Sequence, residues 1–434
     1  MDCKSTNFFR FYTIVFVTCH KKKRSPNKTL IEGMVKQSAI QTNRGLRIFH
    51  LTANRAKQSA NQATTAIWFF RFFAIQNHPL MKKHLLTLTL LIMTATAATA
   101  QTYGDEGPTL TPNRMGLIYE DAINENVPGQ VNIRRVSYKI EGIDVVANVY
   151  TPAGYEPKKT YAAIVVAHPN GGSKDQVAGL YAQKLAEAGF FTIAFDARYQ
   201  GESGGEPRRT DKPANRMGDI MGAIDFIQNY PGVDKERIGA FGICGGGGYT
   251  FATAQVDKRI KAVGTLSLFN TGDVRRNGYM RTQLDNIMER QRDACLARQK
   301  EAAGADPELA GFMNWTPEEA RQIKVDLYRD GYFYYGVTHK SPHAPGTYLK
   351  SSLMDMMAWD ATDHADLIDQ PLLIIAGEIA DSRYMSEEAF VKATRTTDKE
   401  LFIVPGATHI RTYFVKEYVD QITAKIQKFF TEKL

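Results

Sequence analysis

The chain has 434 residues, of which 43% are hydrophobic, 11% aromatic and 23% charged. This is the composition of a globular protein, so it excludes a wholly disordered, collagen-like or coiled-coil chain. The formal charge of +8 belongs to one end of the chain. Residues 1–80 hold 13 Lys and Arg with only two acidic residues, whereas residues 101–434 hold 39 basic and 44 acidic residues. The net charge of −5 over residues 101–434 gives no reason to expect nucleic acid as a partner.

Residues 81–100 are typical of a secretory signal peptide. Lys82 and Lys83 form a short positive region, an apolar run follows at 85–93, and Ala98-Thr99-Ala100 is a small-x-small cleavage site. The apolar run is shorter than the roughly 20 residues that a transmembrane helix needs. Because no Cys follows the cleavage site, we expect a periplasmic or secreted protein with no stable membrane anchor. An internal apolar helix is the alternative interpretation.

Residues 1–80 precede this segment and show neither helical nor strand periodicity. Because a signal peptide should begin a protein, we interpret Met81 as the start and residues 1–80 as an upstream mis-start that is not part of the fold. The basic run Lys21–Arg24 allows a second interpretation, a nucleic-acid or nuclear-import patch.

From residue 131 onward the sequence alternates between strand-like and helix-like segments, which predicts a doubly wound, mainly parallel α/β sheet. Two β-rich runs, 131–140 and 143–151, flank a Glu-Gly hairpin signal. Further strands are expected at 162–167, 191–195, 238–241, 260–267, 371–376 and 400–404, with helices at 176–188, 217–228, 245–254, 386–393 and 413–430.

Residues 268–360 interrupt this alternation. They are charged, aromatic and helical, with helices expected at 287–300 and 317–330 and no clear strand. An insertion between two strands of such a sheet lies where a cap covers an active site. We therefore predict one catalytic domain, residues 101–434, with an inserted helical cap at about 268–360.

The segment Gly242-Ile243-Cys244-Gly245-Gly246 carries the strongest chemical signal. A strand leads into this G-x-C-x-G sequence and a helix follows it, which is the pattern of a nucleophile elbow with Cys in place of Ser. The residues two before and two after the nucleophile must be small, and both are Gly. The N-terminus of the following helix favours a thiolate. A phosphate-binding loop is excluded, because no Lys-Ser/Thr pair follows. A small buried Cys in a tight turn is the structural alternative.

A nucleophilic thiol needs a base and a group that orients the base. His409 follows the last predicted strand, so it lies at the same edge of the sheet as Cys244. Asp381 follows the preceding strand and is the expected acid, with Glu378 as the alternative. The order nucleophile, acid, histidine is that of an α/β-hydrolase triad.

The tetrahedral oxyanion needs two backbone donors. We expect the amide of Gly245, directly after the nucleophile, and the amide of Asn170 in the loop after the strand at 162–167. His168 in the same loop is interpreted as structural, with a catalytic role as the alternative.

The remaining polar and aromatic groups allow two interpretations each. Asp196 and Arg198 are expected to tie loops together rather than to contact substrate. Asp360, Asp363, His364 and Asp366 suggest a metal site, but capping and solvation explain them, so we predict no metal and no cofactor. In the aromatic run 332–335 we expect Tyr334 and Tyr335 to contact substrate, although such runs also form core.

These motifs resemble the α/β-hydrolase superfamily and, within it, the dienelactone-hydrolase-like branch, whose nucleophile is Cys. The most specific parts are His168-Pro-Asn-Gly-Gly172, Asp196-x-Arg-x-x-Gly-x-Ser203 and the G-x-C-x-G segment, and the resemblance covers about 130–434. It implies Cys244 as nucleophile, Asp381 as acid and His409 as base. The long insertion, the additional N-terminal strands and the signal peptide depart from compact dienelactone hydrolases, so dienelactone itself is doubtful as the substrate.

The expected function is therefore that of an exported hydrolase. It would cleave a small ester, lactone or thioester through an acyl-enzyme on Cys244. One alternative is a serine-peptidase-like enzyme, although this chain has Cys244 and no Ser at the elbow. The other is a non-catalytic binding protein on the same fold.

Overall fold

The computed structural model describes residues 108–434 except 312, 314 and 345, and the predicted mis-start and signal peptide lie outside these residues.

Eight strands form one sheet in the order β1-β2-β4-β3-β5-β6-β9-β10. The six neighbouring strands β4-β3-β5-β6-β9-β10 pair in parallel. The pairs β1–β2 and β2–β4 are antiparallel. The strands are β1 Asn132–Ile140, β2 Ile143–Thr151, β3 Tyr161–Ala167, β4 Phe191–Phe195, β5 Val233–Ile243, β6 Ile260–Leu266, β9 Leu372–Gly377 and β10 Lys399–Val404. The predicted doubly wound sheet is confirmed.

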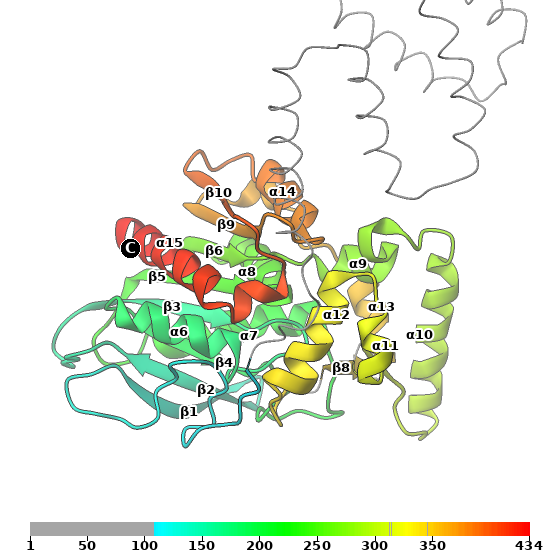
Figure 1. Ribbon diagram of the computed structural model, residues 1–434, viewed down its shortest axis with the longest axis horizontal. Coiled ribbons are helices and arrows are strands. Elements are labelled where there is room, and N and C mark those ends of the chain that lie inside the picture. Colours follow the sequence, from blue (N-terminus) through cyan, green and yellow to red (C-terminus); the bar gives the residue numbers. More distant parts are fainter. Residues whose placement is uncertain (1–107, 312, 314, 345) are drawn as a thin grey trace, which may run out of the picture. The chain divides into compact units, whose positions relative to one another are not determined.

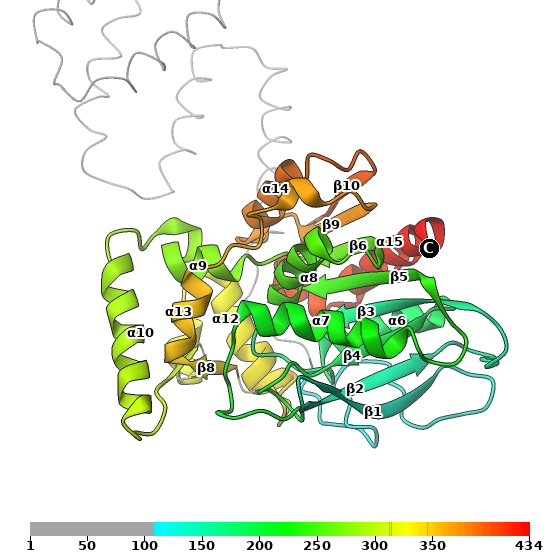
Figure 2. The ribbon, with the colours of Figure 1, turned by 180° about the vertical axis from the view of Figure 1, so that it is seen from behind.

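Helices cover both faces of the sheet, which explains the continuous apolar runs in its central strands. Helices α6 (Val177–Glu187) and α15 (Lys416–Lys433) lie on one face, and α7 (Pro213–Ile227) and α8 (Gly245–Val256) lie on the other (Figures 1 and 2). All residues of β4 and β9 are buried. Helix α14 (Arg383–Lys392) connects β9 to β10.

Several boundaries differ from the sequence prediction, and two of the differences have a clear local physical reason. Helix α7 begins at Pro213, four residues earlier than predicted, because Pro lacks the N–H that the first turn leaves unpaired. The last helix begins at Lys416, and a separate 3₁₀ turn, η5 (Ile410–Tyr413), precedes it. This turn holds the residues just after His409 beside the sheet.

The hairpin between β1 and β2 is as tight as its sequence indicates. Glu141 (φ 51°) and Gly142 (φ 82°) are both left-handed, as a two-residue type I′ turn requires. The flanking residues Ile140 and Ile143 pair directly across it.

The insertion between β6 and β9 is largely helical and lies to one side of the sheet (Figure 1). The predicted helix 317–330 is two helices, because a capping box of Thr316 and Glu319 begins a short first helix and the chain then bends. A short antiparallel strand pair, too brief to show a period-2 pattern, was not predicted. The elements are α9 Thr271–Asn277, η1 Tyr279–Arg281, α10 Ile287–Ala302, β7 Leu309–Gly311, α11 Pro317–Arg321, α12 Asp326–Phe333, η2 Tyr334–Thr338, β8 Thr347–Leu349, η3 Lys350–Ser352, α13 Leu353–Met357 and η4 Ala365–Leu367.

Within the part of the chain that the structure describes, no helix combines the length and apolarity needed to cross a membrane.

Candidate active site

Cys244 stands at the sharp turn between β5 and α8. Its backbone has φ 56° and ψ −120°, a conformation that is strained for any residue with a side chain. A Cβ on Gly242 would lie 2.3 Å from the carbonyl oxygen of Gly246, and one on Gly246 would lie 2.4 Å from that of Ala167. Both glycines are therefore sterically required, and the turn has the geometry of a nucleophile elbow.

Three polar groups surround the sulfur of Cys244. The backbone amides of Gly245 and Asn170 and the hydroxyl of Tyr413 all form hydrogen bonds with it. Burial nevertheless raises the pKa of the thiol, and it outweighs these hydrogen bonds and the charge of Arg275, which lower that pKa. The expected influence of the helix N-terminus, which favours a thiolate, is thus opposed by burial, so the thiol needs a base to take its proton.

The loop after β3 is fixed over the elbow by the side chain of Asn170. Its Nδ2 donates to Oγ1 of Thr271 at 2.9 Å. A Cβ on Gly245 would come within 2.1 Å of the Asn170 Oδ1, so the two residues are packed together without spare space. The two amides expected to hold an oxyanion thus lie at the same sulfur.

His409 is buried between two hydroxyl groups. Its Nδ1 lies 2.5 Å from Oγ of Ser382, and its Nε2 lies 2.9 Å from the hydroxyl of Tyr413. Burial lowers the pKa of His409 to about 3, so the ring is neutral at neutral pH. Tyr413, which also bonds to Cys244, therefore stands between the base and the thiol. The sequence analysis did not single out Tyr413; its only signal is the four-residue spacing from His409.

The two candidate acids do not contact His409 among the described residues. Oδ2 of Asp381 accepts a hydrogen bond from the amide of Leu327 in α12 at 3.1 Å, and burial raises the pKa of Asp381. Oε2 of Glu378 accepts from the amide of Gly406 at 2.9 Å. The sequence placed Asp381 against the histidine, whereas in the structure its neighbour Ser382 fills that place. The cap holds the carboxylate away from the ring.

The two tyrosines expected to bind substrate differ in position. Tyr335 is buried, and the charge of Cys244 and the hydroxyl of Tyr413 are among the groups that act on its own hydroxyl, so it borders the thiol site. Tyr334 is a packing residue: its ring stacks on His339 at 4.4 Å and meets Tyr413 edge-to-face at 5.4 Å. The aromatic run thus contributes one residue to the site and one to the core around it.

His168 connects two loops behind the elbow. Its Nδ1 lies 2.7 Å from the carbonyl oxygen of Pro169, and its Nε2 accepts from the amide of Ala197 at 3.1 Å. Burial, reinforced by the charge of Arg216, lowers its pKa to about 3. These contacts fit the structural role that the sequence analysis favoured.

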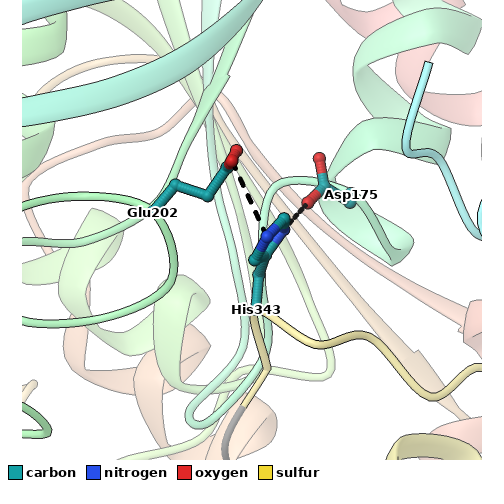
Figure 3. Close-up of side chains that lie close together, drawn as sticks. All are labelled: Asp175, Glu202 and His343. Atoms are coloured by element: carbon teal, nitrogen blue, oxygen red, sulfur yellow. Dashed lines mark hydrogen bonds and ion pairs between the residues drawn. The ribbon is translucent and has the colours of Figure 1, made fainter.

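A second polar cluster joins the cap to the sheet domain. Asp175, Glu202 and His343 face one another within 4.8 Å (Figure 3), which suits a metal ion. However, the buried ammonium of Lys174 already pairs with Asp175 at 3.3 Å, with Glu202 at 2.6 Å and with Asp196 at 3.0 Å. Nδ1 of His343 donates to Oδ2 of Asp175 at 2.8 Å. The ammonium of Lys174 thus already supplies the positive charge that a metal ion would bring. We therefore interpret the cluster as an ion-pair network.

Arg198 and Asp360, also noted in the sequence, have local partners. Arg198 bonds to Asp219 at 2.5 Å and to Glu141 at 2.5 Å, which ties its loop to α7 and to the β1–β2 hairpin. Asp360 accepts from Asn270 at 2.7 Å and from the amide of Thr362 at 2.8 Å, as a turn-capping residue does.

Comparison with known proteins agrees with this geometry. The dienelactone hydrolase family matches residues 147–267, which include the elbow and the loop after β3. The Escherichia coli (strain K12) protein YcjY is 38% identical over 296 residues, which cover 67% of this chain and 95% of YcjY. Protein PA2218 of Pseudomonas aeruginosa is 37% identical over 316 residues, covering 70% of this chain and 82% of that protein.

Solved structures show the same fold. The crystal structure of PA2218 superimposes with a TM-score of 0.66 at 33% identity, covering 71% of this chain and 96% of that chain. The α/β hydrolase GrgF from Penicillium sp. sh18 has a TM-score of 0.55 at 18% identity, covering 70% and 99% of the two chains. The chain therefore belongs to the same family as YcjY and PA2218, has the α/β-hydrolase fold, and matches the dienelactone hydrolase family over residues 147–267.

Proposed function

We propose that this protein is an exported hydrolase that cleaves small esters, lactones or thioesters through a covalent acyl-enzyme on Cys244. One observation carries the proposal. The thiol lies on a strained elbow, and the two amides that an oxyanion needs, those of Gly245 and Asn170, are within hydrogen-bonding distance of its sulfur. A buried Cys with only a packing role requires neither feature.

The proton route in this mechanism passes through Tyr413. As the sulfur attacks the substrate carbonyl, the thiol proton moves to the Tyr413 oxygen, and the Tyr413 hydroxyl proton moves to Nε2 of His409. The amides of Gly245 and Asn170 then turn from the sulfur to the new oxyanion. This route requires the His409 tautomer with its proton on Nδ1, donated to Ser382; the 2.5 Å contact allows it.

Collapse of the tetrahedral intermediate returns the proton along the same route to the leaving group. A water molecule then attacks the thioester, with His409 accepting its proton, and Cys244 is released as a thiol. Asp381 remains the proposed acid that stabilises the imidazolium, because a hydroxyl such as that of Ser382 carries no charge. Its side chain must leave the amide of Leu327 to do so.

The substrate range follows from the leaving group. A thiolate is itself readily expelled, so esters and thioesters suit the site better than amides. Thiohydrolase aneE of Aspergillus aculeatus is 29% identical over 124 residues, which cover 29% of this chain and 37% of that protein, and its name supports including thioesters. Export through residues 81–100 is part of the proposal and rests on the sequence of that segment.

The test is hydrolysis of p-nitrophenyl butyrate by the purified protein, followed by treatment with iodoacetamide and peptide mapping. We expect activity to be lost in proportion to alkylation of Cys244, and Cys244→Ala to be inactive. Cys295→Ala is the matched control, because Cys295 is exposed on α10. Hydrolysis that survives full alkylation of Cys244 would disprove the proposal.

A further inference from the structure

Arg275 lies on the face of α9 that borders the active site. It follows Thr271 by four residues, which places the two side chains on the same side of the helix. The hydroxyl of Thr271 accepts the hydrogen bond of Asn170, the residue that packs over the elbow. In the environment of Cys244, burial raises the pKa of the thiol, and the charge of Arg275 is among the groups that lower it.

The guanidinium of Arg275 forms no ion pair with any of the described residues, and its buried Nε has no hydrogen-bond partner among them. The guanidinium lies over the ring of Tyr348, whose centroid is 4.8 Å from Cζ. A partly buried guanidinium without a carboxylate is costly, because charged groups inside proteins are ordinarily paired.

An acid whose charge acts on Arg275, Asp211, is already engaged elsewhere. Its carboxylate lies 3.5 Å from Arg216, and both residues are buried. Arg216 in turn lies over the ring of Tyr249, with 5.0 Å between Cζ and the ring centroid. Asp211 is thus paired with Arg216 and not with Arg275.

We propose that Arg275 binds a carboxylate on the acyl part of the substrate, so that the preferred substrates are monoesters or monothioesters of dicarboxylic acids. This inference rests on the proposed function. A planar guanidinium fits a carboxylate with two parallel hydrogen bonds. The single charge of Arg275 matches a monoanion better than a phosphate dianion. The ring of Tyr348 covers the guanidinium with apolar surface, which strengthens such a pair.

The first test compares iodoacetate with iodoacetamide, which are alike in size and differ by one negative charge. In both reactions the sulfur forms a bond to carbon and iodide leaves. Cys295 is the internal control, because it is exposed on the same chain. We expect the rate ratio of iodoacetate to iodoacetamide to be at least about 5-fold higher at Cys244 than at Cys295, as read by peptide mapping.

Variants assign this preference to one side chain. Arg275→Gln should lower the ratio at Cys244 about 5-fold and leave it unchanged at Cys295, and Arg275→Lys should restore most of it. Arg276→Gln is the matched control, because Arg276 on the same helix already pairs with Asp360 at 3.2 Å. An equal ratio at the two cysteines, or one that Arg275→Gln does not change, would overturn the inference.

The second test uses hydrolysis. We expect kcat/KM for mono-p-nitrophenyl adipate to exceed that for p-nitrophenyl hexanoate by at least about 10-fold, and Arg275→Gln to abolish that preference. Equal values with activity that still depends on Cys244 would overturn the role of Arg275 and leave the proposed function standing. If alkylation shows the anion preference but neither ester is hydrolysed, the carboxylate site stands and the proposed function fails.

Discussion

The hydroxyl of Tyr413 lies 2.9 Å from Nε2 of His409 and forms a hydrogen bond with the sulfur of Cys244. The histidine therefore reaches the thiol through an intervening phenol. This arrangement accounts for a buried, neutral histidine beside a thiol whose pKa burial raises, because neither group needs to be charged before substrate arrives.

Tyr413→Phe should remove the proton route while keeping the ring and its packing. We expect kcat/KM for p-nitrophenyl butyrate to fall about 100-fold, the scale of one general acid–base step. The pH midpoint of Cys244 alkylation should rise as well, because the lost hydrogen bond lowers the pKa of the thiol. Tyr418→Phe, which loses a hydrogen bond to Gly406 outside this route, is the control. Full activity in Tyr413→Phe would exclude the route.

Asp381→Asn and Ser382→Ala separate the two groups proposed to act on His409. We expect about a 1,000-fold loss of kcat/KM for Asp381→Asn, because the imidazolium loses its counter-charge, and about a 10-fold loss for Ser382→Ala. Glu378→Gln serves as the control, since its carboxylate bonds to Gly406 instead. A larger loss in Ser382→Ala than in Asp381→Asn would mean that Asp381 serves only the contact with the cap.

Gly246→Ala should destabilise the fold rather than only the chemistry. The new methyl group would lie 2.4 Å from the Ala167 oxygen and 2.5 Å from the His168 oxygen, and both are backbone atoms that cannot move aside. We expect a loss of about 3 kcal/mol in the free energy of unfolding, measured with urea. Gly331→Ala, whose Cβ meets only Ile410 at 3.8 Å inside α12, should be neutral or stabilising by up to about 1 kcal/mol. Equal effects of the two changes would contradict the steric account.

His168 should make the protein sensitive to acid. Its pKa is lowered to about 3 in the folded state, chiefly by burial, whereas an unfolded histidine titrates near 6.5. Below pH 6.5 the unfolded chain gains a proton that the folded chain does not bind, so stability falls as the pH falls. The loss from this residue between pH 7.5 and 5.0 is about 2 kcal/mol.

The check compares wild type with His168→Asn by urea unfolding at both pH values. The other titrating groups contribute to both proteins, so the difference isolates His168. We expect the pH-dependent loss to be smaller by about 2 kcal/mol in the variant. The same loss in both proteins would show that His168 does not titrate as described.

The sequence was informative where local sterics determine the structure. The elbow could be predicted because Gly242 and Gly246 have to be small on either side of Cys244. The position of His409 followed from strand order, which brings the ends of parallel strands to one edge. The fold class followed from the alternation of strands and helices.

The remaining site depends on contacts between distant segments. Asp381 bonds to Leu327, which lies 54 residues away in the cap, and no local pattern encodes that partner. Tyr413 bonds to Cys244 because a 3₁₀ turn precedes α15, a detail that helical periodicity does not resolve. Arg275 lies in the cap, and only in three dimensions does it become visible that no acidic side chain of the described residues forms an ion pair with it.

The most direct test of the central claim is the mass of the protein after rapid acid quenching during turnover of p-nitrophenyl butyrate. We predict a species heavier by one butyryl group, located on the peptide that contains Cys244 and absent in Cys244→Ala. An active protein that carries no acyl group on Cys244 at any time point, or carries one on another residue, would contradict the assignment of Cys244 as the nucleophile.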